Sequence, residues 1–363
     1  MAAVQVTVRD VAKKAEVSIS TVSRVLTGNA RVSPELRQRV IEAVEELGYR
    51  PNALARGLRM RRTAVIGLLI PDISNPFFGQ LARVVEDAAN NRGYAILLCN
   101  SQNSRRREIQ YLDLLRTQQV DGVLVVTSGA VGDQLDEFFK LTGAAVLALD
   151  RRIPQFGGPW IGVDPYPGAK EAVRHLLELG HRRIGVVRGV EGSVSSDERY
   201  NAIARALDES GLPQERWIWS GEYTLETGVE AGVALAQLPD EERPTAVITT
   251  SEFSAYGLIE GASRHGISVP EQLSVVGYDN TAFAEVFRPA LTVIAQPIEE
   301  MGTLAVDSIL RLINAEQEPQ LPPVAPVAGA LQPRDEVETV EDAVLPTFLV
   351  KRSSTAVSPH SEL

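Results

Sequence analysis

The first fifty residues carry hydrophobic positions at helical spacing in three short segments. The apolar positions of the first segment are Val8, Val11, Ala12 and Ala15. The second segment runs from about Ile19 to Thr27, with Ser18 before it as a predicted N-cap. Its apolar stripe is Val22, Val25 and Leu26. Two short helices joined by a tight turn predict a helix-turn-helix.

The third segment has clearer ends. Ser33 is a predicted N-cap, Pro34 occupies the first helical position, and Gly48 ends the helix. Its apolar face consists of Leu36, Val40, Val44 and Leu47. Three helices of this length bury enough surface together to form a small all-α domain, although each is too short to be stable alone. Such a domain binds either DNA or another protein.

The pattern changes after Thr63, where apolar runs alternate with amphipathic segments to the end of the chain. The apolar runs include AVIGLLI, YAILLCN, DGVLVVTSG, AAVLALD, RRIGVVRG, TAVITT and LSVVGYD. Repeated β–α alternation of this kind predicts a doubly wound α/β fold, with parallel sheets covered on both faces. The series is long enough for two subdomains, and we expect a ligand cleft where their strand ends face each other.

Charge is distributed unevenly between these two regions. The net charge of the whole chain is −11, but residues 1–62 hold 12 Lys and Arg against 6 Asp and Glu. The remaining residues hold 24 basic against 41 acidic side chains. A basic head on an acidic body favours DNA rather than protein as the partner of the three-helix domain, with contacts confined to the head and weakened by salt.

Several classes of protein are excluded by what the sequence lacks. No apolar run is long enough for a membrane span, the N-terminus has no signal-peptide core, and the single Cys99 has no internal disulfide partner, so we expect a cytoplasmic protein. The phosphate-binding patterns GxGxxG and GxxxxGK[ST] are missing, and no catalytic set of residues is evident. We therefore expect no enzyme and no cofactor. His175, His181 and His265 lack metal-ligand spacing, so we interpret them as structural or solvated.

The basic residues 51–62 connect the two regions and are interpreted as a hinge. A basic segment with an exposed leucine can fold as a helix on DNA, with Leu58 inserted between base steps of the minor groove. Such a helix needs a second copy beside it to cover its apolar face. We therefore expect a homodimer on a pseudo-palindromic DNA site.

Polar residues occur where the predicted strands of the body end. Phe77 follows the first strand, Thr127 the third, Asp150 the fourth and Asp279 a later one, while Ser195 and Arg199 open a helix and Gln296 ends LTVIAQ. Ligands of doubly wound folds bind at these strand ends. Carboxylates that accept from hydroxyl groups, an arginine that donates, and an aromatic ring such as Phe77 or Tyr223 suit a sugar.

The head resembles the N-terminal signature of the LacI/GalR family of bacterial transcriptional regulators. The resemblance rests on TVRDVAKKAEVSISTVSRVLTG and VSPELRQRVIEAVEELGYRPNALARGLR. It implies that Ile19, Ser20 and Arg24 read base edges in the major groove and that Leu58 is the inserted hinge leucine. The further predicted DNA contacts are Thr21, Asn52, Ala55 and Arg59. One departure is Glu16, at a turn position where the family usually has glycine.

The resemblance extends through the body, in HLLELGHRRIGVV, SVSSDERYNAI, LSVVGYDNT and LPTFLVKRSST. It implies a sensor domain like a periplasmic sugar-binding protein, with effector contacts at Phe77, Thr127, Asp150, Ser195, Arg199, Tyr223, Ser251, Asp279 and Gln296. The family commonly has Asn-Asp where this chain has Ser251 and Glu252, which predicts a change in the ligand that fits.

These observations together predict a repressor controlled by a small molecule, with a defined domain order. The order is a DNA-binding domain (1–50), a hinge (51–62), an N-subdomain (63–163 and 293–314), a C-subdomain (164–292 and 345–354) and a flexible insertion (315–344) with five prolines. A sugar is the expected effector and a purine corepressor the alternative. A periplasmic sugar receptor is a further alternative, disfavoured by the basic head.

Overall fold

The computed structural model describes residues 6–26, 32–49, 62–127, 132–212, 217–315 and 340–359. The chain divides into two compact units, Met1–Ala64 and Val65–Leu363. No helix within the described ranges is both long enough and apolar enough to cross a membrane.

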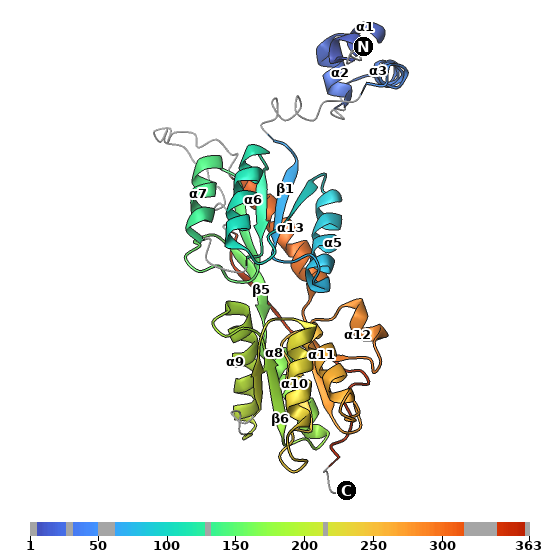
Figure 1. Ribbon diagram of the computed structural model, residues 1–363. Coiled ribbons are helices and arrows are strands. Elements are labelled where there is room, and N and C mark those ends of the chain that lie inside the picture. Colours follow the sequence, from blue (N-terminus) through green and yellow to red (C-terminus); the bar gives the residue numbers. More distant parts are fainter. Residues whose placement is uncertain are drawn as a thin grey trace, which may run out of the picture. The chain divides into compact units, whose positions relative to one another are not determined.

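The first unit is a three-helix domain made of α1 (Val8–Lys14), α2 (Ile19–Leu26) and α3 (Pro34–Leu47) (Figure 1). One fully buried valine from each helix, Val11, Val22 and Val40, forms the centre of its core. The Ser33 Oγ accepts a hydrogen bond from the backbone N–H of Leu36, and Gly48 ends α3 with a φ of 58°. The three predicted helices are confirmed. Helix α2 ends at Leu26, the last residue of the first described range.

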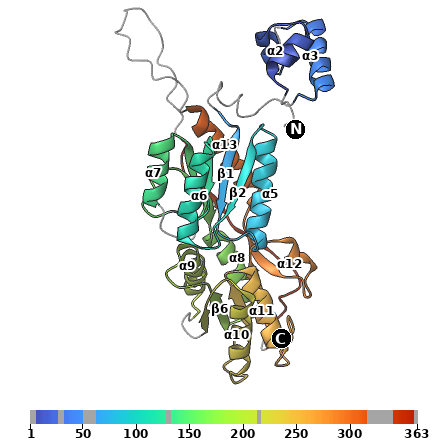
Figure 2. The same ribbon diagram turned by 45° about the horizontal axis from the view of Figure 1, so that its top comes forward.

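The second unit contains two six-stranded sheets, each covered by helices on both faces (Figures 1 and 2). We call each sheet with its helices a lobe. The first lobe has the strand order β11-β5-β4-β3-β1-β2, and all its strand pairs are parallel. Its strands are β1 (Val65–Ile70), β2 (Ala95–Asn100), β3 (Gly122–Val125), β4 (Ala145–Asp150), β5 (Trp160–Asp164) and β11 (Ala343–Pro346).

Two apolar cores lie on opposite faces of the first sheet. Helices α5 (Pro76–Asn90) and α13 (Ile298–Ala315) pack on one face, and α6 (Arg105–Thr117) and α7 (Gly132–Thr142) pack on the other. Strand residues alternate between these cores, since Leu68 contributes to the first and Leu69 to the second. Cys99 is buried in the second core, as the sequence indicates.

The second lobe repeats the arrangement with the strand order β12-β10-β9-β8-β6-β7. Its strands are β6 (Ile184–Arg188), β7 (Ile218–Ser220), β8 (Ala246–Thr249), β9 (Ser274–Tyr278), β10 (Thr292–Ala295) and β12 (Phe348–Val350). All pairs are parallel except β10 with β12. Helices α8 (Tyr166–Glu178) and α9 (Val194–Glu209) cover one face, α10 (Leu225–Ala236) and α11 (Glu252–Ser263) the other, and α12 (Ala282–Val286) follows β9. The doubly wound α/β fold with two parallel-sheet subdomains is thus confirmed.

Helices α10 and α11 approach each other through glycines. A Cβ atom at Gly228 or Gly232 would collide with the α11 backbone, and one at Gly257 or Gly261 with the α10 backbone. Only glycine permits this backbone-to-backbone contact, so the close crossing of the two helices depends on these residues.

The chain passes between the lobes three times, and these crossings correct the predicted subdomain boundaries. The crossings lie between β5 and α8, between β10 and α13, and at Thr347 between β11 and β12. Residues 293–295 therefore belong to the second lobe, because β10 pairs with β9. Residues 343–346 belong to the first lobe, because β11 pairs with β5.

Described elements occupy both ends of the predicted insertion (315–344). Ala315 ends α13, and residues 343 and 344 belong to β11. Residues 316–339 lie outside the described residues.

Two histidines, His175 and His181, contact residues 355 and 356. His175 Nε2 lies 2.9 Å from Thr355 Oγ1, and His181 contacts Thr245 Oγ1 through Nδ1 and the Ala356 carbonyl through Nε2, at 2.9 and 3.0 Å. Burial lowers the pKa of both imidazoles, which favours their neutral form. No group of three His, Cys, Asp or Glu side chains that could hold a metal ion occurs in the described ranges.

Candidate functional site

The outer face of α2 presents the residues that the sequence predicts to read DNA. Ile19, Ser20 and Arg24 are exposed, whereas Val22 and Val25 on the opposite face are buried. The Ser18 Oγ accepts a hydrogen bond from the backbone N–H of Thr21 at 3.1 Å and lies 2.7 Å from the Ser20 Oγ. The cap thus fixes the start of α2, and with it the side chains that point outward.

The turn before α2 places Glu16 in the left-handed region of backbone conformation, with a φ of 53°. This is the position where the family usually has glycine, and a side chain there costs about 1 to 2 kcal/mol. The turn keeps its shape because the Arg39 guanidinium donates to the Ala15 carbonyl at 2.7 Å and pairs with Glu16 at 3.2 Å. The predicted hinge contacts Asn52, Ala55, Leu58 and Arg59 lie outside the described residues.

The predicted effector residues Asp150 and Asp279 lie at the ends of strands from different lobes. Asp150 is the last residue of β4 in the first lobe, and Asp279 directly follows β9 in the second. Both have positive φ angles, 65° and 74°, a conformation rare in residues other than glycine. Both carboxylates are buried. Strained backbone at two strand ends is typical of a functional site.

Arg199 of α9 is the cation beside Asp279, whereas Asp150 Oδ2 lies 3.5 Å from Arg151 Nε and feels Arg199 only through its charge. The Arg199 Nη1 lies 3.6 Å from Asp279 Oδ2 and donates to the Thr250 carbonyl at 2.9 Å. Asp279 Oδ1 accepts a hydrogen bond from Gln296 Nε2 at 2.7 Å. Three predicted residues, Arg199, Asp279 and Gln296, thus form one buried network in the second lobe.

Two tyrosines flank the same arginine. The Arg199 guanidinium lies 4.1 Å from the ring centre of Tyr278 and 5.7 Å from that of Tyr223. Stacking on an aromatic face fixes the plane of a guanidinium while leaving its N–H groups directed sideways. Tyr278 is not among the residues predicted from the sequence, because its pattern is that of the last residue of a buried strand. Its place directly before Asp279 in VVGYD is the signal that could have identified it.

The charges of the two lobes influence one another at this point. Burial raises the pKa of the Asp150 carboxyl and Asp279 adds to the rise, whereas Arg151 and Arg199 oppose it. Burial acts to lower the pKa of the Arg199 guanidinium, but Asp279, the two tyrosines and Asp150 together raise it above its ordinary value. Residues far apart in sequence are therefore within electrostatic range across the lobe boundary.

Several polar atoms around Arg199 are buried and have no hydrogen-bond partner within the part of the chain that the structure describes. They are Asp150 Oδ2, Ser195 Oγ, Ser196 Oγ, Tyr223 OH, Tyr278 OH and Gln296 Oε1. A buried polar atom left without a partner costs about 1 to 3 kcal/mol. Six such atoms near one arginine indicate a site that is completed by a polar ligand.

Three other predicted ligand residues make their contacts within the protein. Phe77 is almost fully buried in the core of the first lobe. The Thr127 hydroxyl donates to the buried carboxylate of Glu108 at 2.8 Å. Ser251 caps α11, since its Oγ accepts from the backbone N–H of Ser254 at 3.1 Å. These three residues do not point unpartnered atoms at the Arg199 network.

Glu252, the other half of the unusual pair, is also engaged within the protein. Its carboxylate accepts hydrogen bonds from the hydroxyls of Tyr256 at 2.5 Å and Thr281 at 2.7 Å. Burial raises the pKa of Glu252 to about 6, although these two hydrogen bonds oppose the rise. The hydrogen bonds of Ser251 and Glu252 therefore go to neighbouring residues of the second lobe, and not to the atoms that line the Arg199 network.

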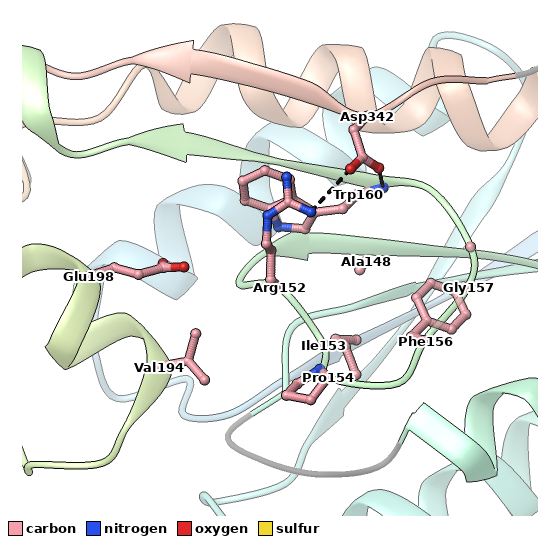
Figure 3. A pocket seen from close by; sticks show the side chains of 11 residues that line it. Ala148, Arg152, Ile153, Pro154, Phe156, Gly157, Trp160, Val194, Glu198 and Asp342 are labelled. Atoms are coloured by element: carbon pink, nitrogen blue, oxygen red, sulfur yellow. Dashed lines mark hydrogen bonds and ion pairs between the residues drawn. The ribbon is translucent and has the colours of Figure 1, made fainter.

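A cavity of about 460 Å³ adjoins this network at the boundary of the lobes (Figure 3). The loop between β4 and β5 forms one wall, and the first turn of α9 forms another. None of its lining residues is among the residues predicted from the sequence.

Comparison with known proteins places these features in a family. The sequence profile of the bacterial regulatory proteins of the lacI family matches residues 7–52, and that of the periplasmic binding protein-like domain matches residues 173–355. Catabolite control protein A of Priestia megaterium is 38% identical over 317 residues, which cover 86% of this chain and 93% of that protein. The HTH-type transcriptional repressor PurR of Actinobacillus pleuropneumoniae is 35% identical over 312 residues, which cover 86% of this chain and 92% of that protein.

Solved structures agree in fold. A lac repressor dimer bound to operator and the anti-inducer ONPF superposes with a TM-score of 0.80 at 25% identity, covering 97% of this chain and 99% of that chain. A LacI family regulator of Enterococcus faecium with bound ribose has a TM-score of 0.68 at 30% identity, covering 81% and 99%. The chain belongs to the lacI family of bacterial regulatory proteins and is a DNA-binding transcriptional regulator, not an enzyme.

Proposed function

We propose that this regulator is a repressor whose affinity for its operator is set by a sugar bound between the two lobes. The buried atoms around Arg199 that lack a hydrogen-bond partner in the described residues carry the proposal, because Asp150 Oδ2 comes from the first lobe and Ser195 Oγ, Tyr223 OH and Gln296 Oε1 come from the second. A ligand that satisfies both sets at once holds the lobes in one relative position.

The chemistry of these atoms suits a polyhydroxylated ligand. The carboxylate of Asp150 accepts from hydroxyl groups, Arg199 donates to them, and the hydroxyls of Ser195 and Tyr223 do either. The proposed contacts are Asp150, Ser195, Arg199, Tyr223, Asp279 and Gln296. We assign Phe77, Thr127 and Ser251 to the support of the site, because each already has its partners within the protein. The ribose in the Enterococcus faecium relative agrees with a sugar.

A purine is the second candidate for the effector. The aromatic rings of Tyr223 and Tyr278 beside Arg199 favour it, because a planar base stacks on such rings. A planar base, however, has few hydrogen-bonding groups for so many separate acceptors and donors, so we rank a sugar first.

For the head, we propose that Ile19, Ser20, Thr21 and Arg24 contact base edges in the major groove. Arginine can donate two hydrogen bonds to a guanine, and isoleucine can contact a thymine methyl group. By the family resemblance, Asn52, Ala55, Leu58 and Arg59 contact the minor groove and backbone. We further propose a homodimer on a pseudo-palindromic operator, as in the lac repressor dimer, acting in the cytoplasm, where the operator is.

The proposed control works through the angle between the lobes. A ligand that favours one angle moves the hinge segments of a dimer relative to each other, and the hinges hold the minor groove only when they pack together. Ligand and operator must then alter each other's affinity, with a coupling of about 1 to 3 kcal/mol.

A thermal-shift screen of the full-length protein with sugars and purines tests the effector assignment. A sugar that binds raises the unfolding temperature, by mass action on the folded state. The Asp150→Asn variant should lose the shift, whereas Asp113→Asn, at an exposed carboxylate that pairs with Arg116, should keep it. A shift with purines alone would replace the sugar by the second candidate.

A further inference from the structure

The cavity beside the Arg199 network is built from both lobes. Arg152, Phe156 and Trp160 line it from the first lobe, together with Asp342 before β11, and Val194 and Glu198 line it from α9 of the second lobe. Its volume of about 460 Å³ falls within the range of about 300 to 1,000 Å³ that small-molecule sites occupy.

The first-lobe wall is held in place by several contacts. The Arg152 guanidinium lies 4.0 Å from the ring centre of Trp160 and pairs with Asp342 at 3.1 Å (Figure 3). Asp342 Oδ1 also accepts the backbone N–H of Trp160 at 2.9 Å. The Trp160 Nε1 is buried and has no partner among the described residues. The Arg152 guanidinium covers the Trp160 ring, so the surface of this wall consists of the guanidinium itself and the half-buried Phe156 ring, both held in a fixed arrangement.

The second-lobe wall offers an acceptor. Figure 3 shows the Glu198 carboxylate reaching from α9 toward Arg152 across the cavity, with Val194 one turn earlier. The ion pair of Arg152 is the one with Asp342. Glu198 therefore has its carboxylate available at the mouth of the cavity.

The cavity and the Arg199 network adjoin each other. Val194 and Glu198 directly precede Ser195 and Arg199 on α9, and Arg152 lies two residues after Asp150. Burial raises the pKa of the Glu198 carboxyl, and the charge of Asp150 raises it further, because the two carboxylates lie within electrostatic range of each other. The cavity and the network thus share the first turns of α9 and the segment from Asp150 to Arg152.

We propose that the cavity is a second sugar subsite, so that the effector is a disaccharide rather than a monosaccharide. This inference rests on the proposed sugar effector. The first ring occupies the Arg199 network. The second ring packs against Phe156 and the plane of the Arg152 guanidinium, with Arg152 as a donor and Glu198 as an acceptor. Carboxylate, guanidinium and aromatic groups are the same combination that suits the first ring.

Isothermal titration calorimetry of the full-length protein tests the subsite. The probes are glucose and galactose, and disaccharides that contain them in different linkages: maltose, cellobiose, trehalose, lactose and melibiose. At least one disaccharide should bind about tenfold or more tightly than its monosaccharides, because the second ring adds contacts of its own.

Filling the cavity provides the decisive variant. Val194 is 38% exposed, so Val194→Trp can be accommodated in the fold while it occupies the space of the second ring. This variant should bind the disaccharide about tenfold more weakly and the monosaccharide unchanged. Val357→Trp, at an exposed valine outside the cavity, is the matched control and should change neither affinity.

The outcomes separate the inference from the proposed function. Monosaccharide binding without any gain from a second ring overturns the subsite and leaves the sugar effector in place. An equal loss of both affinities in Val194→Trp, or no loss of either, also overturns the subsite. Binding of no saccharide overturns the sugar effector and the subsite together.

Discussion

Replacing Arg199 by methionine tests whether this arginine neutralises the buried carboxylates of the effector site. Arg199 is 9% exposed, pairs with Asp279 and donates to the Thr250 carbonyl. Methionine keeps the aliphatic part of the side chain but removes the guanidinium, which leaves Asp279 buried without its cation and Tyr278 without its stacking partner. Removing one partner of a buried ion pair costs about 3 to 5 kcal/mol, so Arg199→Met should lower the free energy of unfolding of the ligand domain by that amount.

A double-mutant cycle separates the charge from the packing. Asp279→Asn keeps the shape of the side chain and removes its charge, so Arg199→Met should cost about 1 to 3 kcal/mol less in that background than in the native one. Urea unfolding of the full-length chain, followed through the transition of the ligand domain, gives the four free energies. Arg205→Met is the control, because Arg205 lies on the same helix in an exposed pair with Glu209 and should cost less than about 1 kcal/mol.

The reasoning is refuted if Arg199→Met costs no more than Arg205→Met, or if the effects of Arg199→Met and Asp279→Asn are additive. Either result would mean that the arginine does not compensate the carboxylate. The network would then be packing alone, and its fit to a ligand would lose its electrostatic basis.

Three further predictions concern other parts of the molecule. The pKa of Glu252 is raised from 4.5 to about 6, so the folded state binds this proton more tightly than the unfolded chain does. The free energy of unfolding should therefore fall by up to about 2 kcal/mol as pH rises from 4.5 through 6. The Glu252→Gln variant should lack this pH dependence in urea unfolding measured at several pH values. Gly257→Ala should lower stability by about 1 to 3 kcal/mol, because the new Cβ collides with the Leu225 carbonyl, whereas Gly79→Ala in open space should not. Arg24→Ala should cost about 1 to 3 kcal/mol of binding free energy at one base position, measured on a panel of operator variants. Arg61→Ala, in the basic hinge segment, should weaken binding to all the variants alike. A uniform loss with both substitutions would refute the assignment of Arg24.

The helix-turn-helix could be predicted closely because its signals are local. Ser18, Ser33 and Gly48 mark helix ends through hydrogen bonds within a few residues, and all three act as predicted. The departure at Glu16 also marks an unusual backbone conformation, since this residue adopts the left-handed conformation at a turn position where the family usually has glycine.

The candidate site could be predicted where topology alone determines it. Asp150 and Asp279 lie at the carboxyl ends of strands, and Arg199 and Gln296 lie near those ends, so a doubly wound fold brings them together whatever the details of packing. Ser251 shows the limit of this reasoning. A serine after a strand serves equally as a ligand contact or as a helix cap, and only the hydrogen bond to Ser254 identifies it as a cap.

The subdomain boundaries and the cavity could not be predicted, because both depend on contacts between distant segments. Thr347 separates strands of different sheets within one apolar run, and no local signal marks it. The cavity joins Arg152, Asp342 and Glu198, which come from three separate parts of the sequence.

The central claim, that a ligand between the lobes controls binding to the operator, is tested most directly by measuring both affinities in one linked set. The full-length protein would first select its operator from random DNA. The Kd for that operator would then be measured with and without the sugar, and the Kd for the sugar with and without operator. The two ratios should be equal and about 5- to 150-fold, as reciprocal coupling requires. A sugar that binds the protein but leaves its affinity for the operator unchanged would contradict the account.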